Sequence, residues 1–270
     1  MTRKRGEGPP LLVHKHYDKG SVFAPENLMR EARRQKNIPE GQVPQICVLD
    51  PDGDIVRNLL SANRARPNPH WACYHTRLYD FECEGIGLGV IGCAVGAPFA
   101  VLVAEELFAS GCRLLISITS SGQILPKGSP PYFVLIEKAL RDEGASYHYL
   151  PPSDYSFAEA DLIDMFDGVF DGLPVPVYRG ASWTTDAPFR ETAPAIAHAR
   201  KRGLLAVEME AAALYAFAAA RRKPVVCFAH VTNRMGRVEG DFEKGIGEGS
   251  AGALRIIGAT ATTWLSRNQG

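Results

Sequence analysis

The stretch Leu204-Leu-Ala-Val-Glu-Met-Glu-Ala-Ala-Ala-Leu-Tyr215 decides the fold class, because it passes directly from a short apolar run into an alanine-rich run. Leu204–Val207 is short and apolar, which predicts a buried strand, and Glu210–Arg222 is typical of a helix. A strand that runs straight into a helix is the repeating unit of α/β proteins. We therefore look for the same unit elsewhere in the chain.

Further strand and helix patterns alternate on both sides of this junction. Strands are predicted over 43–49, 71–84, 88–94, 113–119, 175–179 and 224–231, and helices over 25–36, 54–63, 98–110, 132–143, 190–202 and 250–267. Continuous apolar strands separated by helices predict a sheet that is covered on both faces. We expect one α/β domain over 25–270, three layers deep with a central mixed, partly parallel sheet, and an N-terminal extension over 1–24 that is partly disordered.

Composition excludes several classes of protein. The chain has 270 residues, 46% of them hydrophobic, and its 30 Lys+Arg balance its 30 Asp+Glu. A net charge of zero argues against a nucleic-acid-binding protein, and no apolar run approaches the roughly 20 residues that span a bilayer. The six cysteines form no C-x-x-C pair and the seven histidines form no zinc motif, so we expect a cytoplasmic protein with free thiols and no metal or organic cofactor.

Two carboxylates and a thioether stand where the first strand meets its helix. Glu208 and Glu210 flank Met209, and two interpretations fit this arrangement. The carboxylates could simply stabilise the positive end of the helix dipole. Alternatively, a carboxylate accepts hydrogen bonds from two hydroxyl groups while the methionine packs on a ring face, which is a good arrangement for holding a sugar.

At this point the sequence resembles the nucleoside phosphorylases of the purine nucleoside and uridine phosphorylase type, with their nucleosidase relatives. The resemblance covers 46–235. It rests on four motifs in matching order: Gly92-Cys-Ala-Val-Gly-Ala-Pro98, Ser120-Ser-Gly-Gln-Ile124, Trp183-Thr-Thr-Asp-Ala-Pro-Phe189 and Glu208-Met-Glu-Ala-Ala-Ala-Leu-Tyr215.

The resemblance implies a role for each motif. Glu210 would bind the ribose hydroxyls and Met209 would pack on the sugar. The other substrate-binding residues it implies are Ser120, Ser121, Gly122, Glu208 and Phe189 or its neighbour Pro188. Asn233 and Arg234 would stand near the base. Asparagine donates a hydrogen bond but cannot protonate a purine N7 as an aspartic acid can, so we expect a pyrimidine or 6-oxopurine base rather than adenine.

The chain departs from the family at the positions that bind phosphate. Leu49 and Gly53 replace the glycine and arginine of the family's G-D-P-x-R turn, and Ser117 and Tyr74 stand where two further arginines are expected. Arginine forks make phosphate sites. We therefore expect a degenerate phosphate site.

Three functions remain open. The first is cleavage of a nucleoside N-glycosidic bond despite the degenerate phosphate site. The second is hydrolysis in which Asp54 activates water, as a carboxylate of this turn does in the nucleosidases; Asp52 and Asp54 could instead only cap the following helix. The third is a non-catalytic protein that binds a nucleoside or base. The resemblance also implies a homo-oligomer, a dimer or a hexamer.

Overall fold

The computed structural model describes residues 8–235, 241–242, 244, 247 and 249–268. The expectation of disorder for the N-terminal extension falls partly on residues 1–7, which lie outside the described residues. No helix among the described residues is both long and apolar enough to cross a bilayer. All six cysteines are free, and five of them are buried.

The described residues form one mixed sheet, as the sequence predicts. Its strands are β1 (Ile46–Asp50), β2 (Ala65–Pro67), β3 (Leu78–Cys83), β4 (Ile86–Gly92), β5 (Leu114–Gln123), β6 (Tyr132–Asp142), β7 (Tyr155–Phe157), β8 (Val177–Thr185), β9 (Leu204–Glu208) and β10 (Val225–Asn233). The strand order is β10-β6-β8-β9-β5-β1-β4-β3-β2. Strand β10 also pairs with β5, so strands β5, β10, β6, β8 and β9 close into a ring of pairings.

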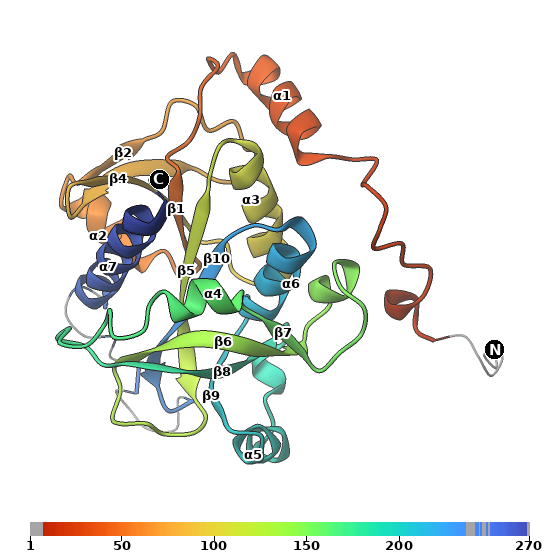
Figure 1. The fold of residues 1–270 in the computed structure, drawn as a ribbon, viewed down its shortest axis with the longest axis vertical. Helices are drawn as coiled ribbons and strands as arrows, with labels where there is room; N and C mark the ends of the chain where they lie inside the picture. The colour runs from red at the N-terminus through yellow and green to blue at the C-terminus, as the bar shows by residue number, and fades with distance from the viewer. Residues whose placement is uncertain (1–7, 236–240, 243, 245–246, 248, 269–270) are drawn as a thin grey trace.

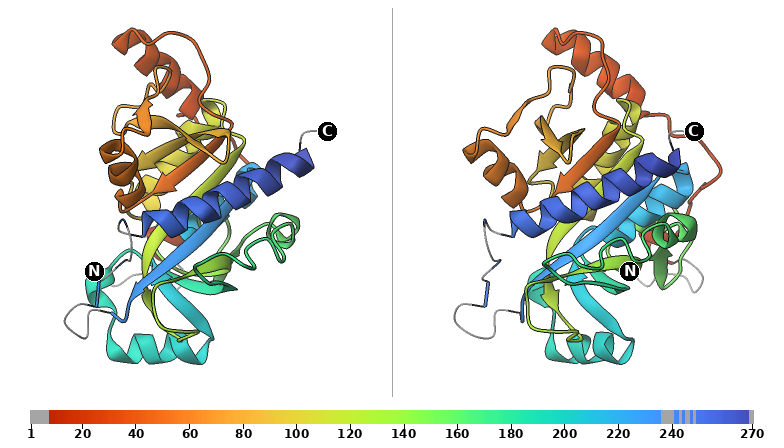
Figure 2. Two further views of the ribbon diagram at one scale, coloured as in Figure 1. Left: turned by 90° about the vertical axis from the view of Figure 1, so that its left-hand side faces the viewer. Right: turned by 60° about the vertical axis from the view of Figure 1, so that its left-hand side comes forward.

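Helices cover both faces of this sheet. They are α1 (Pro25–Lys36), α2 (Asp54–Ser61), α3 (Ala97–Ala109), α4 (Ala160–Asp164), α5 (Ala193–Lys201), α6 (Ala211–Arg221) and α7 (Ser250–Asn268), with 3₁₀ turns η1 (Pro10–Leu12), η2 (Ala145–His148) and η3 (Pro188–Arg190). Helices α2 and α7 lie on one face of β1, β4 and β5, and α3 and α6 lie on the other (Figure 1). Helix α7 runs alongside β10 in both views of Figure 2. Two apolar cores result, one on each face.

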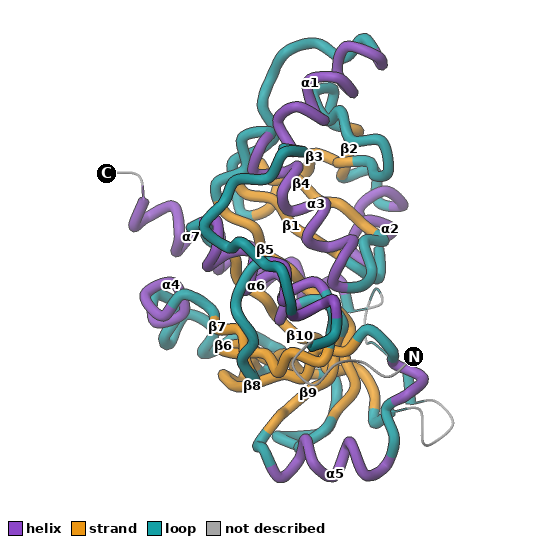
Figure 3. Tube along the Cα trace, turned by 90° about the vertical axis from the view of Figure 1, so that its right-hand side faces the viewer, coloured by secondary structure: helices purple, strands orange, loops and turns teal. Residues whose placement is uncertain are grey.

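The two halves of the sheet are joined by its long strands. Strands β1 to β4 lie toward one end of the molecule and β6, β8 and β9 toward the other, with α5 beyond them (Figure 3). Strand β5 pairs in parallel with both β1 and β10, and antiparallel with β9. The C-terminal end of β5 therefore lies between the ends of β10 and β9, which places the loops after these strands together.

The predicted helix over 132–143 is wrong, because Tyr132–Asp142 is the long strand β6. Its first residues, Tyr132-Phe-Val-Leu-Ile136, are β-branched, aromatic or leucine, and most are fully buried. The strand pairs with β10 and β7 on one edge and with β8 on the other. These long-range pairings outweigh the local helical pattern. The predicted strand over 71–84 is also shorter in the structure, where only Leu78–Cys83 is a strand.

Candidate functional site

The predicted site residues converge at the ends of β5, β9 and β10. Register pairs Gly122 with Asn233 on one side and with Val207 on the other. The strand ends open onto a cavity of about 650 Å³. Its lining residues are Asp52, Ser120, Ser121, Gly122, Pro188, Phe189, Glu191, Ala193, Ile196, Val207, Glu208, Met209, Thr232, Asn233, Met235, Phe242 and Lys244.

Glu208 is the last residue of β9, and its carboxylate is fully occupied by the protein. One oxygen accepts hydrogen bonds from Ser182 Oγ at 3.0 Å and Thr184 Oγ1 at 2.5 Å. The other accepts the backbone N–H groups of Glu210 and Ala211, each at 2.7 Å. Burial raises the pKa of Glu208, and these donors oppose that shift. Glu208 therefore holds the junction of β9 and α6.

Glu210 is buried at the N-terminal end of α6 and is not among the cavity-lining residues, although its neighbours Glu208 and Met209 are. Its Oε1 accepts the backbone N–H of Gly96 at 2.7 Å, and its Oε2 accepts that of Met209 at 3.2 Å. Burial, together with the charge of Glu208, raises the pKa of Glu210 to about 8. Each carboxylate oxygen accepts more than one hydrogen bond, so Glu210 keeps capacity for two hydroxyl donors.

Asp50, at the end of β1, holds the turn that follows. Its carboxylate accepts the backbone N–H groups of Gly53 at 3.2 Å and Val56 at 3.0 Å, and burial raises its pKa to about 7. Gly53 has φ +77°, and a Cβ there would lie 2.7 Å from Cys93 Sγ. An arginine at position 53 would therefore be strained in this turn.

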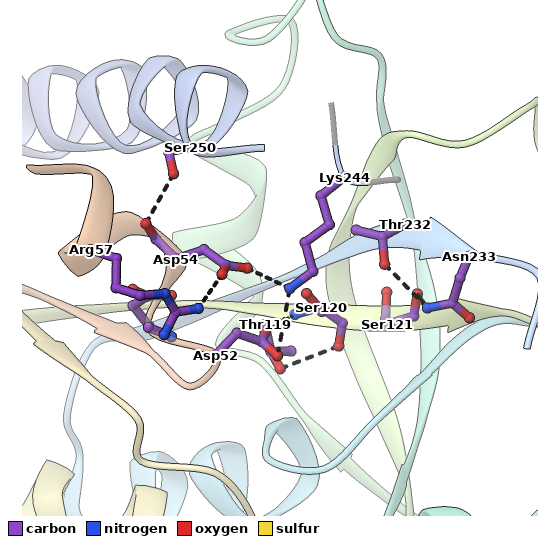
Figure 4. A network of polar contacts seen from close by, with 12 residues as sticks. Asp52, Asp54, Arg57, Thr119, Ser120, Ser121, Thr232, Asn233, Lys244 and Ser250 are labelled. Atoms are coloured by element: carbon purple, nitrogen blue, oxygen red, sulfur yellow. Dashed lines mark hydrogen bonds and ion pairs between the residues drawn. The ribbon is translucent and has the colours of Figure 1, made fainter. Parts of the chain in front are cut away.

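Asp52 and Asp54 follow in the same turn but have different neighbours (Figure 4). Asp52 lines the cavity, and its Oδ2 accepts the backbone N–H of Ser120 at 2.7 Å. Asp54 is not among the cavity-lining residues; its carboxylate forms ion pairs with Arg57 and Lys244. Neither aspartate caps α2 with a side-chain hydrogen bond from the N-cap position, which is Gly53.

Of the predicted base-binding residues, Asn233 and Phe189 line the cavity and Arg234 does not. Asn233 is buried and lines the cavity; its Oδ1 accepts the backbone N–H of Met235 at 2.9 Å, and its Nδ2 donates to Thr232 Oγ1 at 3.1 Å. These bonds fix the orientation of the amide. Arg234 is exposed and is not among the cavity-lining residues. Phe189 lines the cavity from η3, with its ring exposed.

The positions that depart from the family bring no cation to the cavity. Leu49 and Ser117 are buried in adjacent strands, where they are register partners. Tyr74 lies elsewhere, with its hydroxyl donating to Gln35 at 2.9 Å. Among the described residues that line the cavity there is no arginine, and Lys244 is the one lysine.

Sequence reasoning missed several residues of this site. Lys244 lies in a glycine-rich, charged stretch in which no residue spacing indicates a binding role. Glu191 follows Phe189 closely but belongs to no motif. Burial raises the pKa of Glu191 to about 7. Among the described residues, no group of three or more histidine, cysteine, aspartate or glutamate side chains could hold a metal ion.

Comparison with known proteins identifies the relatives of this chain. Residues 45–257 match the phosphorylase superfamily. A guanosine phosphorylase from Halorubrum lacusprofundi is 25% identical over 195 residues, which are 69% of this chain and 76% of that protein. A DeoD-type purine nucleoside phosphorylase from Streptococcus uberis is 28% identical over 143 residues, which are 52% of this chain and 60% of that protein.

Solved structures support the fold. Uridine phosphorylase from Vibrio fischeri, crystallised with 6-hydroxy-1-naphthoic acid, superimposes with a TM-score of 0.69 at 19% identity and covers 84% of this chain and 93% of its own. A second structure of the same enzyme superimposes with a TM-score of 0.66 over the same shares of the two chains.

Proposed function

Because the chain belongs to the phosphorylase superfamily, a family of enzymes, we propose that it cleaves the N-glycosidic bond of a nucleoside. The observation that carries this proposal is the buried carboxylate of Glu210, next in sequence to Met209, which lines the cavity of about 650 Å³. A charge without a full set of partners is expensive to bury. A sugar diol supplies the missing donors, and the methionine supplies an apolar surface for the ring.

The base occupies the part of the cavity lined by Asn233 and Phe189. The amide oxygen of Asn233 accepts the N–H of Met235, so the donor that this residue offers to a base carbonyl is Nδ2, in exchange for its bond to Thr232 Oγ1 or Ser121 O. A donor without a titratable proton suits the carbonyl of a pyrimidine or a 6-oxopurine. Adenine would need a proton on its ring nitrogen, which this residue cannot supply.

Water is the nucleophile that the charges around the cavity favour. The cavity lining offers one ammonium and, among the described residues, no arginine, whereas Asp52, Glu191 and Glu208 bring carboxyl groups that repel a phosphate dianion when they are ionised. We propose that the phosphate site is degenerate, since Gly53 and Ser117 stand where the resemblance expects arginines. Tight phosphate binding needs several charge-assisted hydrogen bonds, each contributing about 1.5–3 kcal/mol.

The proposed hydrolysis needs one carboxylate, which acts as the proton acceptor. The bond between C1′ and the base nitrogen breaks, and the base leaves with the electron pair and takes a proton from solvent. The water oxygen bonds to C1′, and a carboxylate of the Asp50–Asp54 turn accepts the water proton and returns it to solvent. The transition state is oxocarbenium-like, so the same negative charge stabilises it.

The resemblance also leads us to propose a cytoplasmic homo-oligomer, a dimer or a hexamer. Its test is the mass of the protein in solution: a mass of two or six chains supports it, and a monomer at micromolar concentration contradicts it.

The activity is tested with a panel of uridine, inosine, guanosine and adenosine, by following release of the free base. We expect release from the pyrimidine or 6-oxopurine nucleosides and a loss of at least about 100-fold in Glu210→Gln. Glu106→Gln is the matched control, because Glu106 is equally buried, has a pKa that burial also raises, and lies outside this cavity. Tight nucleoside binding without base release over a long incubation would contradict catalysis and favour a binding protein.

A further inference from the structure

Three charged side chains meet beneath the cavity, from two segments far apart in the sequence (Figure 4). Asp52 and Asp54 come from the turn between β1 and α2, and Lys244 comes from the segment between β10 and α7. The Lys244 ammonium forms an ion pair with Asp54 and lies 4.0 Å from Asp52 Oδ1. Its side chain is 18% exposed, so the ammonium is held largely within the protein.

The two aspartates are unequal in this arrangement. The Asp54 side chain is 12% exposed and is bound by two cations, Lys244 and Arg57. The Asp52 side chain is 33% exposed, lines the cavity, and has one oxygen fixed by the N–H of Ser120. Its second oxygen, Oδ1, lies 4.0 Å from the Lys244 ammonium, so Asp52 is held more loosely than Asp54 and is the more exposed of the two.

We propose that Lys244 is a positioning residue: it holds Asp54 out of the cavity and leaves Asp52 as the carboxylate that accepts the proton from water. This inference rests on the proposed hydrolysis. It replaces Asp54 by Asp52 as the base, because a general base needs an oxygen within hydrogen-bond reach of its substrate. Lys244 contacts the aspartates and acts on the reaction through them.

The Lys244 ammonium also places a positive charge close to the Asp52 carboxylate. Without the ammonium, the negative charges of Asp52 and Asp54 repel each other with less compensation. The other titratable groups that interact with Asp52 are Asp50 from β1, Glu210 from the β9–α6 junction and His230 from β10. Burial lowers the pKa of His230 to about 4, so this histidine is neutral in the working range.

The first test compares the two aspartates. Asp52→Asn keeps an oxygen that can accept the Ser120 N–H but loses basicity, so we expect kcat to fall at least about 100-fold with KM changed less than threefold. Asp54→Asn should reduce kcat less than about tenfold. A larger loss of kcat in Asp54→Asn than in Asp52→Asn would overturn the assignment.

The second test measures the pH profile of kcat in wild type, Lys244→Met, Lys244→Arg and Arg57→Met. We expect the acid limb of the profile to move up by about one pH unit in Lys244→Met. It should return toward the wild-type position in Lys244→Arg. Arg57→Met is the matched control, because Arg57 pairs with Asp54 alone and its side chain is 62% exposed. Thermal unfolding of each variant separates these shifts from loss of fold.

The outcomes separate this inference from the proposed function. A wild-type protein that cleaves no nucleoside overturns the proposed function and this inference together. A wild-type protein that hydrolyses nucleosides, with superimposable acid limbs in wild type and Lys244→Met, overturns this inference alone. Phosphate-dependent cleavage whose KM for phosphate rises in Lys244→Met would make Lys244 a phosphate ligand, which also contradicts the positioning role.

Discussion

Glu208 accepts the backbone N–H of Glu210 at 2.7 Å, so one carboxylate of the Glu-Met-Glu motif orients the other. The first glutamate faces the protein, where hydroxyl and backbone donors from β8 and α6 surround it. The second accepts the backbone N–H groups of Gly96 and Met209. The two residues look equivalent in the sequence, but four donors hold Glu208 in place, and we propose that Glu210 is the one that binds a ligand.

Replacing Glu208 tests its structural role. In Glu208→Gln one side-chain oxygen must serve four donors, so at least one buried donor loses its partner. We expect the free energy of unfolding to fall by about 1–3 kcal/mol. Urea unfolding followed by circular dichroism measures this, with Glu31→Gln on the exposed face of α1 as the control. Equal stability of Glu208→Gln and wild type would show that the four bonds contribute little.

The raised pKa of Glu210 predicts how stability depends on pH. The unfolded carboxyl has a value of about 4.5 and the folded one about 8, so between these values the folded protein holds a proton that the unfolded chain has released. Stability should therefore fall as pH rises through this window, by up to a few kcal/mol. Asp50 and Glu191, each with a pKa of about 7, act in the same direction.

The substitution Glu210→Gln removes the contribution of Glu210 to this pH dependence of stability. We expect the variant to lose activity yet to have a flatter stability profile between pH 5 and 8.5, measured by urea unfolding at each pH. Parallel profiles for wild type and Glu210→Gln would contradict the assignment of this titration to Glu210.

Asn233→Asp tests the base preference. An aspartic acid at this position can donate a proton to a purine ring nitrogen, so we expect the ratio of kcat/KM for adenosine to that for inosine to rise at least tenfold. Ser121→Ala, a change in the same part of the cavity, is the control. An unchanged ratio in Asn233→Asp would place the base away from this residue.

The sequence predicts the strand-to-helix units well because apolar runs and turn residues act locally. Helix α1 has the predicted bounds, Pro25–Lys36, and α6 differs by one residue at each end. Strand β6 was misread as a helix because its stability comes from pairing with β10 and β8, which no local pattern reveals.

The residues of the candidate site were predictable from the sequence about as well as the helices and strands were. The motifs located Glu210, Met209, Asn233 and the Ser120–Gly122 loop, which the structure brings to one region. The roles of Asp52 and Asp54 could not be separated, since both are acidic residues of one turn. Their contacts differ because Lys244, a residue that joins the turn only through tertiary contact, pairs more closely with Asp54 than with Asp52.

The identity of the sugar product tests the central claim most directly. Uridine, inosine and guanosine are incubated with the protein in phosphate-free buffer and in buffer with 50-fold excess phosphate, and the sugars are separated by chromatography. We expect free ribose in both buffers, formed at the same rate. Ribose 1-phosphate that appears only when phosphate is added would contradict a cavity that uses water.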